Sequence, residues 1–323
     1  MAAQIDIDVP ADARERDPLQ LAKLVLLWAL WFLAIAGVDA LVRQGAAGAA
    51  AASLLGVATG MLVVAGIGFI GHDIAHGSVV SGERAMRVGV FFSLTAVLFV
   101  PYFLWVRWHN AFHHRYANTP RDSDRLLREE EIDAGLASYR VYRITNLLGF
   151  SLQYVATRVW RTLYRSKGFG DRKKRADVLS LLAVAALYAA AFAVLRGETF
   201  ALGVVAPVIT SLVVVSYYIQ SNHFDRPLTA KPHPVRGSSD VSVPALVDFL
   251  HSNFSQHTAH HVFPSVPSRH YPGLTEKIRA KYPADYRCTP FLIAAWRTLT
   301  LPKIVRDGRF LVDGRGTVRR ELT

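Results

Sequence analysis

Long apolar runs alternate with polar stretches along the chain. Four runs are apolar enough and long enough to cross a membrane as helices: 21–43, 48–70, 178–195 and 199–220. The first two are separated by only a few residues, and the last two by "RGET". Because connections this short hold neighbouring helices together, each pair is expected to form an antiparallel hairpin. The pattern predicts an all-α membrane protein with four transmembrane helices in two hairpins.

A fifth apolar run, 86–104, contains Pro101 and continues into the aromatic and polar "WVRWH". If this run crossed the membrane once, the segments before and after it would lie on opposite sides. Its proline and its flanking residues favour a dipping or in-plane helix instead. Further along, 136–166 mixes Arg with aromatic and aliphatic residues, which is typical of an interfacial amphipathic helix.

Composition supports a membrane protein and fixes its expected orientation. Hydrophobic residues make up 51% of the 323, and charged residues 19%, below the roughly 25% of soluble globular domains. The net charge is +12, with Lys and Arg concentrated in 105–177 and in the C-terminal region. Positive charge collects on the cytoplasmic side, so a single domain, 1–323, is expected with a cytoplasmic cap of 71–177 and 221–323. So apolar a chain is a poor candidate for nucleic-acid binding.

The N-terminus and the cysteine content exclude other classes. The first 20 residues lack the basic start and short apolar core of a cleavable signal peptide, so a short cytoplasmic tail is expected. The one cysteine, Cys288, excludes a disulfide framework and a thiolate metal cage within the chain.

Histidine is concentrated in three short motifs. Nine of the 12 histidines fall in "HDIAH", "HNAFHH" and "HTAHH" or in the "SNHF" after the last apolar run: His72, His76, His109, His113, His114, His223, His257, His260 and His261. Residues four apart on a helix share a face, so the first and last histidines of "HDIAH" and "HTAHH", and His109 with His113, are expected to point the same way. Nine nitrogens exceed the six ligands of an octahedral ion. Two metals are therefore predicted, or one metal with redundant ligands.

The identity of the metal is less constrained by these residues. Neutral imidazole suits Zn, Cu, Fe and Ni, and structural zinc sites need only four ligands and usually include cysteine. An all-nitrogen site beside apolar helices fits redox iron that meets O₂ and a lipid-like substrate, because unactivated C–H bonds require chemistry that side chains do not supply. A zinc-dependent membrane hydrolase and a metal carrier are the alternatives from other classes.

The motifs and their order resemble those of a known family. "GHDIAHGS", "WHNAFHHRYANTPRDSD" and "HTAHHVFPSVPSRHYPGL" are similar to the three histidine boxes of the membrane fatty acid desaturases, and the resemblance extends over about 20–290. It implies two Fe ions in a non-haem di-iron centre, a helical cap over four spans, and O₂-dependent insertion of a double bond into a fatty acyl lipid or acyl thioester. It also implies that the eight box histidines are ligands, together with His223. Related lipid hydroxylases and carotenoid ketolases share these boxes.

Residues next to the boxes are candidates for fixing the ligands. Ligand histidines need a partner that sets their tautomer, and Asp73, Asp122 and Asp124 are the candidates for that role. Some family members carry an Asn four residues before the histidine after the fourth span. Here position 219 is Ile, and Asn222 adjoins His223. Asn222 is therefore a further candidate for contact with the ligands, but this departure argues against a water-bridging role for it. The remaining histidines, His233, His251 and His270, are expected not to be ligands.

The electrons must come from another protein. The chain has no dinucleotide fingerprint, no cysteine cluster for iron–sulfur and no haem module. A ferredoxin or a cytochrome b5-like protein is the expected donor. The basic cytoplasmic face is expected to steer such an acidic carrier, or to serve membrane topology and anionic membrane lipids.

Overall fold

Four long helical segments dominate the structure. The computed structural model describes residues 5–122, 124, 127–129 and 170–322. The four segments are α1 (Leu19–Val42), the continuous α2–η2–α3 (Ala46–Thr59, Gly60–Val64, Ala65–Ala75), α10 (Asp171–Val194), and α11–η6–α12 (Gly197–Phe200, Ala201–Val205, Ala206–His223). Each is long and apolar enough to cross a membrane. The predicted helical class with four membrane-length helices is confirmed, with bounds close to those expected from hydropathy.

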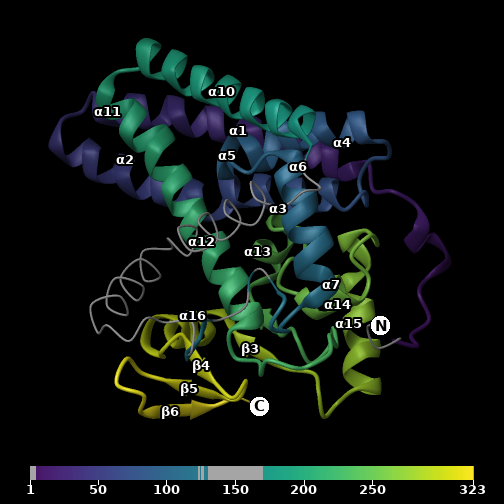
Figure 1. The fold of residues 1–323 in the computed structure, drawn as a ribbon. Helices are drawn as coiled ribbons and strands as arrows, with labels where there is room; N and C mark the ends of the chain where they lie inside the picture. Colours follow the sequence, from purple (N-terminus) through teal and green to yellow (C-terminus); the bar gives the residue numbers. More distant parts are fainter. Residues whose placement is uncertain (1–4, 123, 125–126, 130–169, 323) are drawn as a thin grey trace.

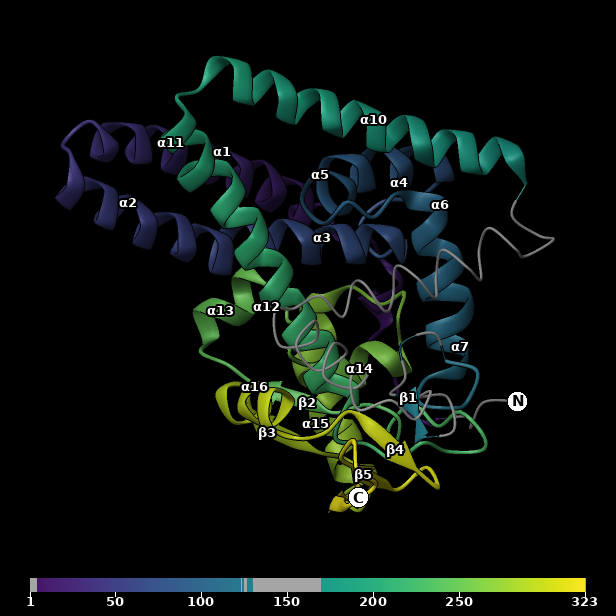
Figure 2. The same cartoon turned by 60° about the vertical axis from the view of Figure 1, so that its left-hand side comes forward.

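Small residues allow the second and fourth segments to lie close together. A Cβ added at Gly56 would lie 2.2 Å from the carbonyl oxygen of Leu202, and one at Gly60 would lie 2.5 Å from that of Pro207. Larger side chains would force the two helices apart. In both views α1 and α2 run side by side, while α12 leaves the long helices obliquely and enters the lower part of the molecule (Figures 1 and 2). The pairing of the spans into two transmembrane hairpins stays a prediction.

The fifth apolar run is sharply bent. A first arm, α4–η3–α5 (Glu83–Val90, Phe91–Thr95, Ala96–Leu98), meets a second, α6–η4–α7 (Tyr102–Trp105, Val106–His113, His114–Tyr116), at 86°. At the bend Phe99 has a φ of 57°, and Pro101 precedes the second arm. Asp177 of α10 accepts hydrogen bonds from the backbone N–H groups of Phe103 (3.1 Å) and Leu104 (2.8 Å), which the start of a helix leaves unpaired. These two hydrogen bonds hold the start of the second arm in its changed direction.

The lower part of the molecule is built from short helices and small sheets. It contains α13 (Ala245–Leu250), α14 (His257–Val262), η7 (Ser268–His270), α15 (Tyr271–Lys281) and α16 (Phe291–Thr300). In Figure 2 α14 lies between the end of α12 and α7. We call this part, together with the arm α6–α7, the cap.

Two sheets in the cap were not expected from the sequence. One has the order β1-β4-β5-β6 (Leu127–Arg128, Ile304–Arg306, Phe310–Val312, Val318–Glu321), with β1 parallel to β4 and the other neighbours antiparallel. The other pairs β2 (Asp240–Ser242) with β3 (Cys288–Pro290) in parallel. Strands of two to four residues carry almost no alternating pattern, which explains why hydropathy did not predict them. The predicted interfacial helix at 136–166 lies outside the described residues.

The N-terminal segment is packed against the cap. Ile5, Ile7 and Val9 contact the buried cluster that contains Leu274 and Ile278 of α15. A short 3₁₀ helix, η1 (Ala11–Arg14), follows, and the backbone N–H of Asp17 donates to the carbonyl of Ser78. The segment before α1 therefore has a defined position beside the end of α3.

Candidate metal centre

The nine histidines of the motifs lie in two adjacent groups. In each group the candidate ligand atoms all lie within 4.8 Å of one another. The first group is His72, His76, His109, His114 and His260, and the second is His113, His223, His257 and His261. The groups adjoin, because the rings of His114 and His261 stack at 4.4 Å. Segments up to 189 positions apart in the sequence thus converge below the long helices.

The first group combines all three motifs. The Nε2 atom of His109 lies 3.1 Å from that of His72 and 3.0 Å from that of His114. The Nε2 of His260 lies 3.0 Å from that of His114. The Nε2 of His76 is buried and has no hydrogen-bond partner among the described residues. The group therefore presents several ring nitrogens to one small volume from α3, the bent arm and α14.

The second group contains a nearly equilateral triangle of nitrogens. The Nε2 atoms of His223, His257 and His261 are separated by 2.9, 3.1 and 3.0 Å. His257 and His261 are one turn apart on α14, as their spacing predicts, and His223 ends α12. His113 completes the group, with its ring 4.6 Å from that of His223 and 4.9 Å from that of His261.

The second motif departs from α-helical geometry. Val106–His113 is a π-helix, in which hydrogen bonds join residues five apart. His109 therefore comes close to His114 in the first group, while His113 belongs to the second. The expected α-helical backbone is wrong for this motif, and His109 and His113 fall in different groups. Their rings are nevertheless 5.1 Å apart, and both residues lie within 4.8 Å of Asp124 in a third, overlapping group. The π-helix lets one short motif serve both groups.

Carboxylates contact the outer nitrogens of two histidines. The Nδ1 of His113 lies 2.9 Å from Asp122 Oδ1 and 3.4 Å from Asp124 Oδ2. The Nδ1 of His72 lies 3.3 Å from Asp73 Oδ1. An Nδ1–H that donates to a carboxylate leaves the Nε2 lone pair free to face the centre of its group. The three aspartates singled out from the sequence therefore lie beside the outer nitrogens of His72 and His113, and their role in fixing these rings stays a prediction.

Other groups that hold the histidines had no sequence signal. The Nδ1–H of His223 donates to the carbonyl of Gly237 (2.8 Å), and the Nδ1 of His260 lies 3.0 Å from the hydroxyl of Tyr271. Buried Asp240 accepts from the backbone N–H of Thr258 (2.6 Å) at the start of α14 and from the Tyr286 hydroxyl (3.0 Å). The partners lie 11 to 46 positions apart in the sequence, too far for helical spacing to link them, although Tyr271 itself falls in the "HYPGL" after the last motif.

The remaining predicted residues lie around the groups. Asn222 is fully buried, and neither polar atom of its side chain has a hydrogen-bond partner among the described residues. His251 lies outside both groups, with its Nε2–H donating to the carbonyl of Met61 at 2.9 Å. His233 and His270 also lie outside them, and His270 Nε2 is 3.8 Å from Asp12.

Burial controls the protonation of the two groups. Loss of water disfavours the charged imidazolium, and neighbouring imidazoles add to this effect. Together they hold the pKa of six histidines well below 6.5: His76, His109, His114, His257, His260 and His261. Burial also acts to lower the pKa of His113, but the charges of Asp122 and Asp124 outweigh it and raise this pKa to about 9. Most of the site is thus kept in the neutral form, which binds metals.

The donor set fits transition-metal ions. Two ligands at right angles around one ion, each about 2.1 Å away, are about 3.0 Å apart, as are the Nε2 atoms here. Mutual hydrogen bonds do not account for this arrangement, because a neutral imidazole has one ring donor and three Nε2 atoms in a triangle compete for it. Buried ring nitrogens without partners, such as His76 Nε2, point to the same conclusion.

The fold and the site define a class of protein, helical with four membrane-length segments and a buried polyhistidine centre. Residues 47–291 match the family described as fatty acid desaturase. The chain is also 27% identical over 257 residues to the fatty acid desaturase of Bacillus subtilis (strain 168), a match that covers 74% of this chain and 69% of that protein. This chain belongs to the fatty acid desaturase family. Membership implies an oxidoreductase, in agreement with the resemblance of its histidine motifs.

Proposed function

We propose that this protein is an O₂-dependent fatty acyl desaturase that holds two iron ions. The observation that carries the proposal is the division of nine histidines into two adjacent all-nitrogen groups under apolar helices. A zinc hydrolase would need three or four ligands in one place, and this arrangement offers more than twice that number. The hydrocarbon substrate is a fatty acyl chain, carried by a lipid or a thioester.

We assign the ligands by group. One iron would be held by His72, His76, His109, His114 and His260, and the other by His113, His223, His257 and His261. Asp73, Asp122 and Asp124 would fix the ligand rings through their Nδ1 atoms. The amide of Asn222, which has no hydrogen-bond partner among the described residues, is next to His223 in the sequence, and we assign it no bridging role.

When bound, the irons would supply the redox chemistry of the reaction –CH₂–CH₂– + O₂ + 2e⁻ + 2H⁺ → –CH=CH– + 2H₂O. The protein's own part is to orient the ligands and to exclude water. Trp105 stacks on the ring of His109 at 4.2 Å, and Phe254 lies 5.0 Å from His72 and 4.9 Å from His257. These aromatic rings shield both groups on the side of the long helices. A dry, fixed site favours attack on the acyl chain over side reactions with water.

The two electrons would arrive from a separate carrier, a ferredoxin or a cytochrome b5-like protein. Residues 224–322 contain 15 basic and 8 acidic side chains, which suits an acidic partner. We place the histidine groups on the cytoplasmic side of the membrane, where such carriers act.

The decisive experiment is lipid profiling of a host that expresses the chain beside a His257→Ala control. A new unsaturated acyl species that appears only with the intact chain would identify the reaction and the position of the double bond. Hydroxylated or ketone products would show that the chain catalyses a related oxidation and not desaturation. Metal analysis of the purified protein should give about two irons per chain, whereas about one zinc would contradict the proposal.

A further inference from the structure

A large groove lies outside the histidine centre. It has a volume of about 1070 Å³, at the upper end of the 300–1,000 Å³ of most small-molecule sites. Its walls come from α1, from α4 and η3, and from Leu187 of α10. None of the nine histidines lines it, so it is not the chamber where the proposed oxidation takes place.

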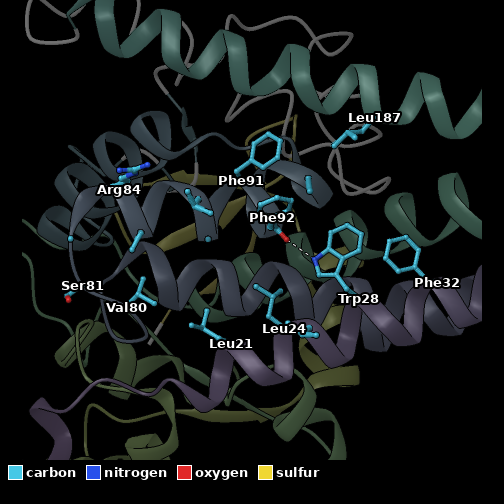
Figure 3. Close-up of a pocket in the computed structure, with 16 residues that line it drawn as sticks. Leu21, Leu24, Trp28, Phe32, Val80, Ser81, Arg84, Phe91, Phe92 and Leu187 are labelled. Carbon is cyan, nitrogen blue, oxygen red and sulfur yellow. Dashed lines mark hydrogen bonds between the residues drawn. The ribbon is translucent and has the colours of Figure 1, made fainter.

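The groove is apolar along its length and polar at one end only. Figure 3 shows Arg84 and Ser81 at one end, with Trp28 and Phe32 toward the other. The indole N–H of Trp28 donates to the carbonyl of Phe92 (2.8 Å), so this wall offers no free donor to an occupant. An occupant must therefore be hydrocarbon over most of its length, with its polar group near Arg84.

The polar end carries an uncompensated positive charge. Arg84 is exposed, and no carboxylate of the described residues forms an ion pair with it. The neighbouring cation on α4, Arg87, lies over the ring of Phe103 at 5.0 Å. Arg84 is therefore the cation placed to meet an anionic group at the mouth, and guanidinium binds phosphate well.

The length of the groove matches one membrane leaflet. Its lining residues on α1 run from Leu21 to Phe32, which is about 16 Å along a helix at 1.5 Å per residue. Half of a hydrocarbon core of about 30 Å is about 15 Å. With α1, one of the membrane-length helices, crossing a bilayer, a groove of this length would extend from the membrane surface to about the midplane.

We propose that this groove binds a membrane phospholipid, with an acyl chain along α1 and η3 and its phosphate on Arg84. The inference rests on the apolar helices and the groove and goes beyond the proposed desaturation. It places a lipid-binding site beside the metal centre but separate from it.

The test is native mass spectrometry of the purified full chain in detergent. Phosphatidylglycerol and a diacylglycerol with the same acyl chains are titrated separately. The wild type is compared with Arg84→Gln and with Ala85→Trp, which fills the groove at an exposed lining position. The matched controls are Arg196→Gln, between α10 and α11, and Ala193→Trp, near the end of α10. Both positions are exposed, and neither lines the groove.

We expect the Kd for phosphatidylglycerol to rise about tenfold in Arg84→Gln, as for the loss of a charge-assisted hydrogen bond, and binding to be lost in Ala85→Trp. The controls should bind as the wild type does, and diacylglycerol should bind weakly and equally to wild type and Arg84→Gln. If both groove variants bind phosphatidylglycerol as the wild type does, the proposal is wrong. The bound lipid would then belong to a non-specific layer around the helices. Because the readout is binding, failure of the desaturase proposal would not alter this result.

Discussion

At the scale of single residues, His113 differs most from the other histidines. Two aspartates face its outer nitrogen, and their charges raise its pKa although the residue is buried. The rings of His223 and His260 are instead held by a backbone carbonyl and a tyrosine hydroxyl. Individual ligand rings, even within one group, are thus held by contacts of different strength.

Removing the stronger carboxylate should weaken the second group. We expect Asp122→Asn to lower iron content or desaturase activity by about 10- to 100-fold, because the amide cannot hold His113 Nδ1–H as a carboxylate does. Metal analysis and product formation of the same preparation provide the measurement. Asp307→Asn is the matched control, since Asp307 is exposed and asparagine tolerates its φ of 50°. Normal iron content and activity in Asp122→Asn would contradict the assigned role.

Histidines outside the two groups provide a contrast at the same scale. His257→Ala should lose iron and activity, since it removes one corner of the nitrogen triangle. His270→Ala should retain both, because that residue lies outside the groups. A fully active, iron-loaded His257→Ala protein would exclude the proposed centre.

The buried imidazoles also predict how the metal-free protein responds to pH. Six histidines have a pKa held well below 6.5 in the folded state, so below pH 6.5 the unfolded chain binds more protons than the folded chain. The free energy of unfolding should therefore fall as pH drops below 6.5. His113 has the opposite sign: its contribution is complete below pH 6.5 and is lost as pH rises toward 9.

The measurement is the thermal midpoint of metal-free protein in detergent between pH 8 and pH 5. We expect a decline on the acid side, because the six neutral imidazoles lose stability there while the contribution of His113 is constant below pH 6.5. Burial raises the pKa of Asp240 to about 6 and so acts in the opposite direction, but the imidazoles outnumber it. A midpoint that is constant or rises below pH 6.5 would show that these imidazoles are not buried in the neutral form.

At the scale of elements, the bent segment decides how the motifs meet. The sequence predicted a dipping or in-plane helix at 86–104, with Pro101 as one of the reasons. The second arm, which meets the first at 86°, begins at hydrogen bonds from Phe103 and Leu104 to Asp177 of α10, which is 74 and 73 residues away in the sequence. The π-helix at 106–113 likewise had no signature in the spacing of its histidines.

The side of the membrane reached by this segment can be tested directly. In a Cys288→Ser background, single cysteines at Glu83 and Val106 should react with an impermeant thiol reagent from the same, cytoplasmic side. A cysteine at Glu198, in α11 at the start of the fourth long segment, should react from the opposite side. Opposite labelling of 83 and 106 would exclude a centre shared by the first two motifs.

At the scale of the whole molecule, charge is distributed unevenly. The C-terminal part of the cap, which contains the third histidine motif, is strongly basic, whereas the long helices carry few charges apart from 171–177 at the start of α10. Such a surface accelerates the approach of an acidic partner, and salt screens the effect within about 10 Å at 0.1 M.

Turnover supported by an acidic electron carrier should therefore slow as salt increases from low ionic strength. Steady-state rates at a carrier concentration below saturation measure this, and a small neutral reductant that supports turnover is the control. If the rate with the carrier does not change with salt, the basic residues of the cap do not steer the carrier. Their positive charge would then serve membrane topology or contact with anionic lipids.

The sequence by itself determined the helical class, the four membrane-length segments and the nine histidines, because apolar length and residue type are local properties. Only the tertiary structure decided how these histidines divide into five and four, since the division depends on a π-helix, a bend and the approach of α14 to the end of α12. Asp240, Tyr271 and the carbonyl of Gly237 became visible for the same reason. Contacts between segments that are distant along the chain form only when the cap packs beneath the long helices, and no local pattern encodes them.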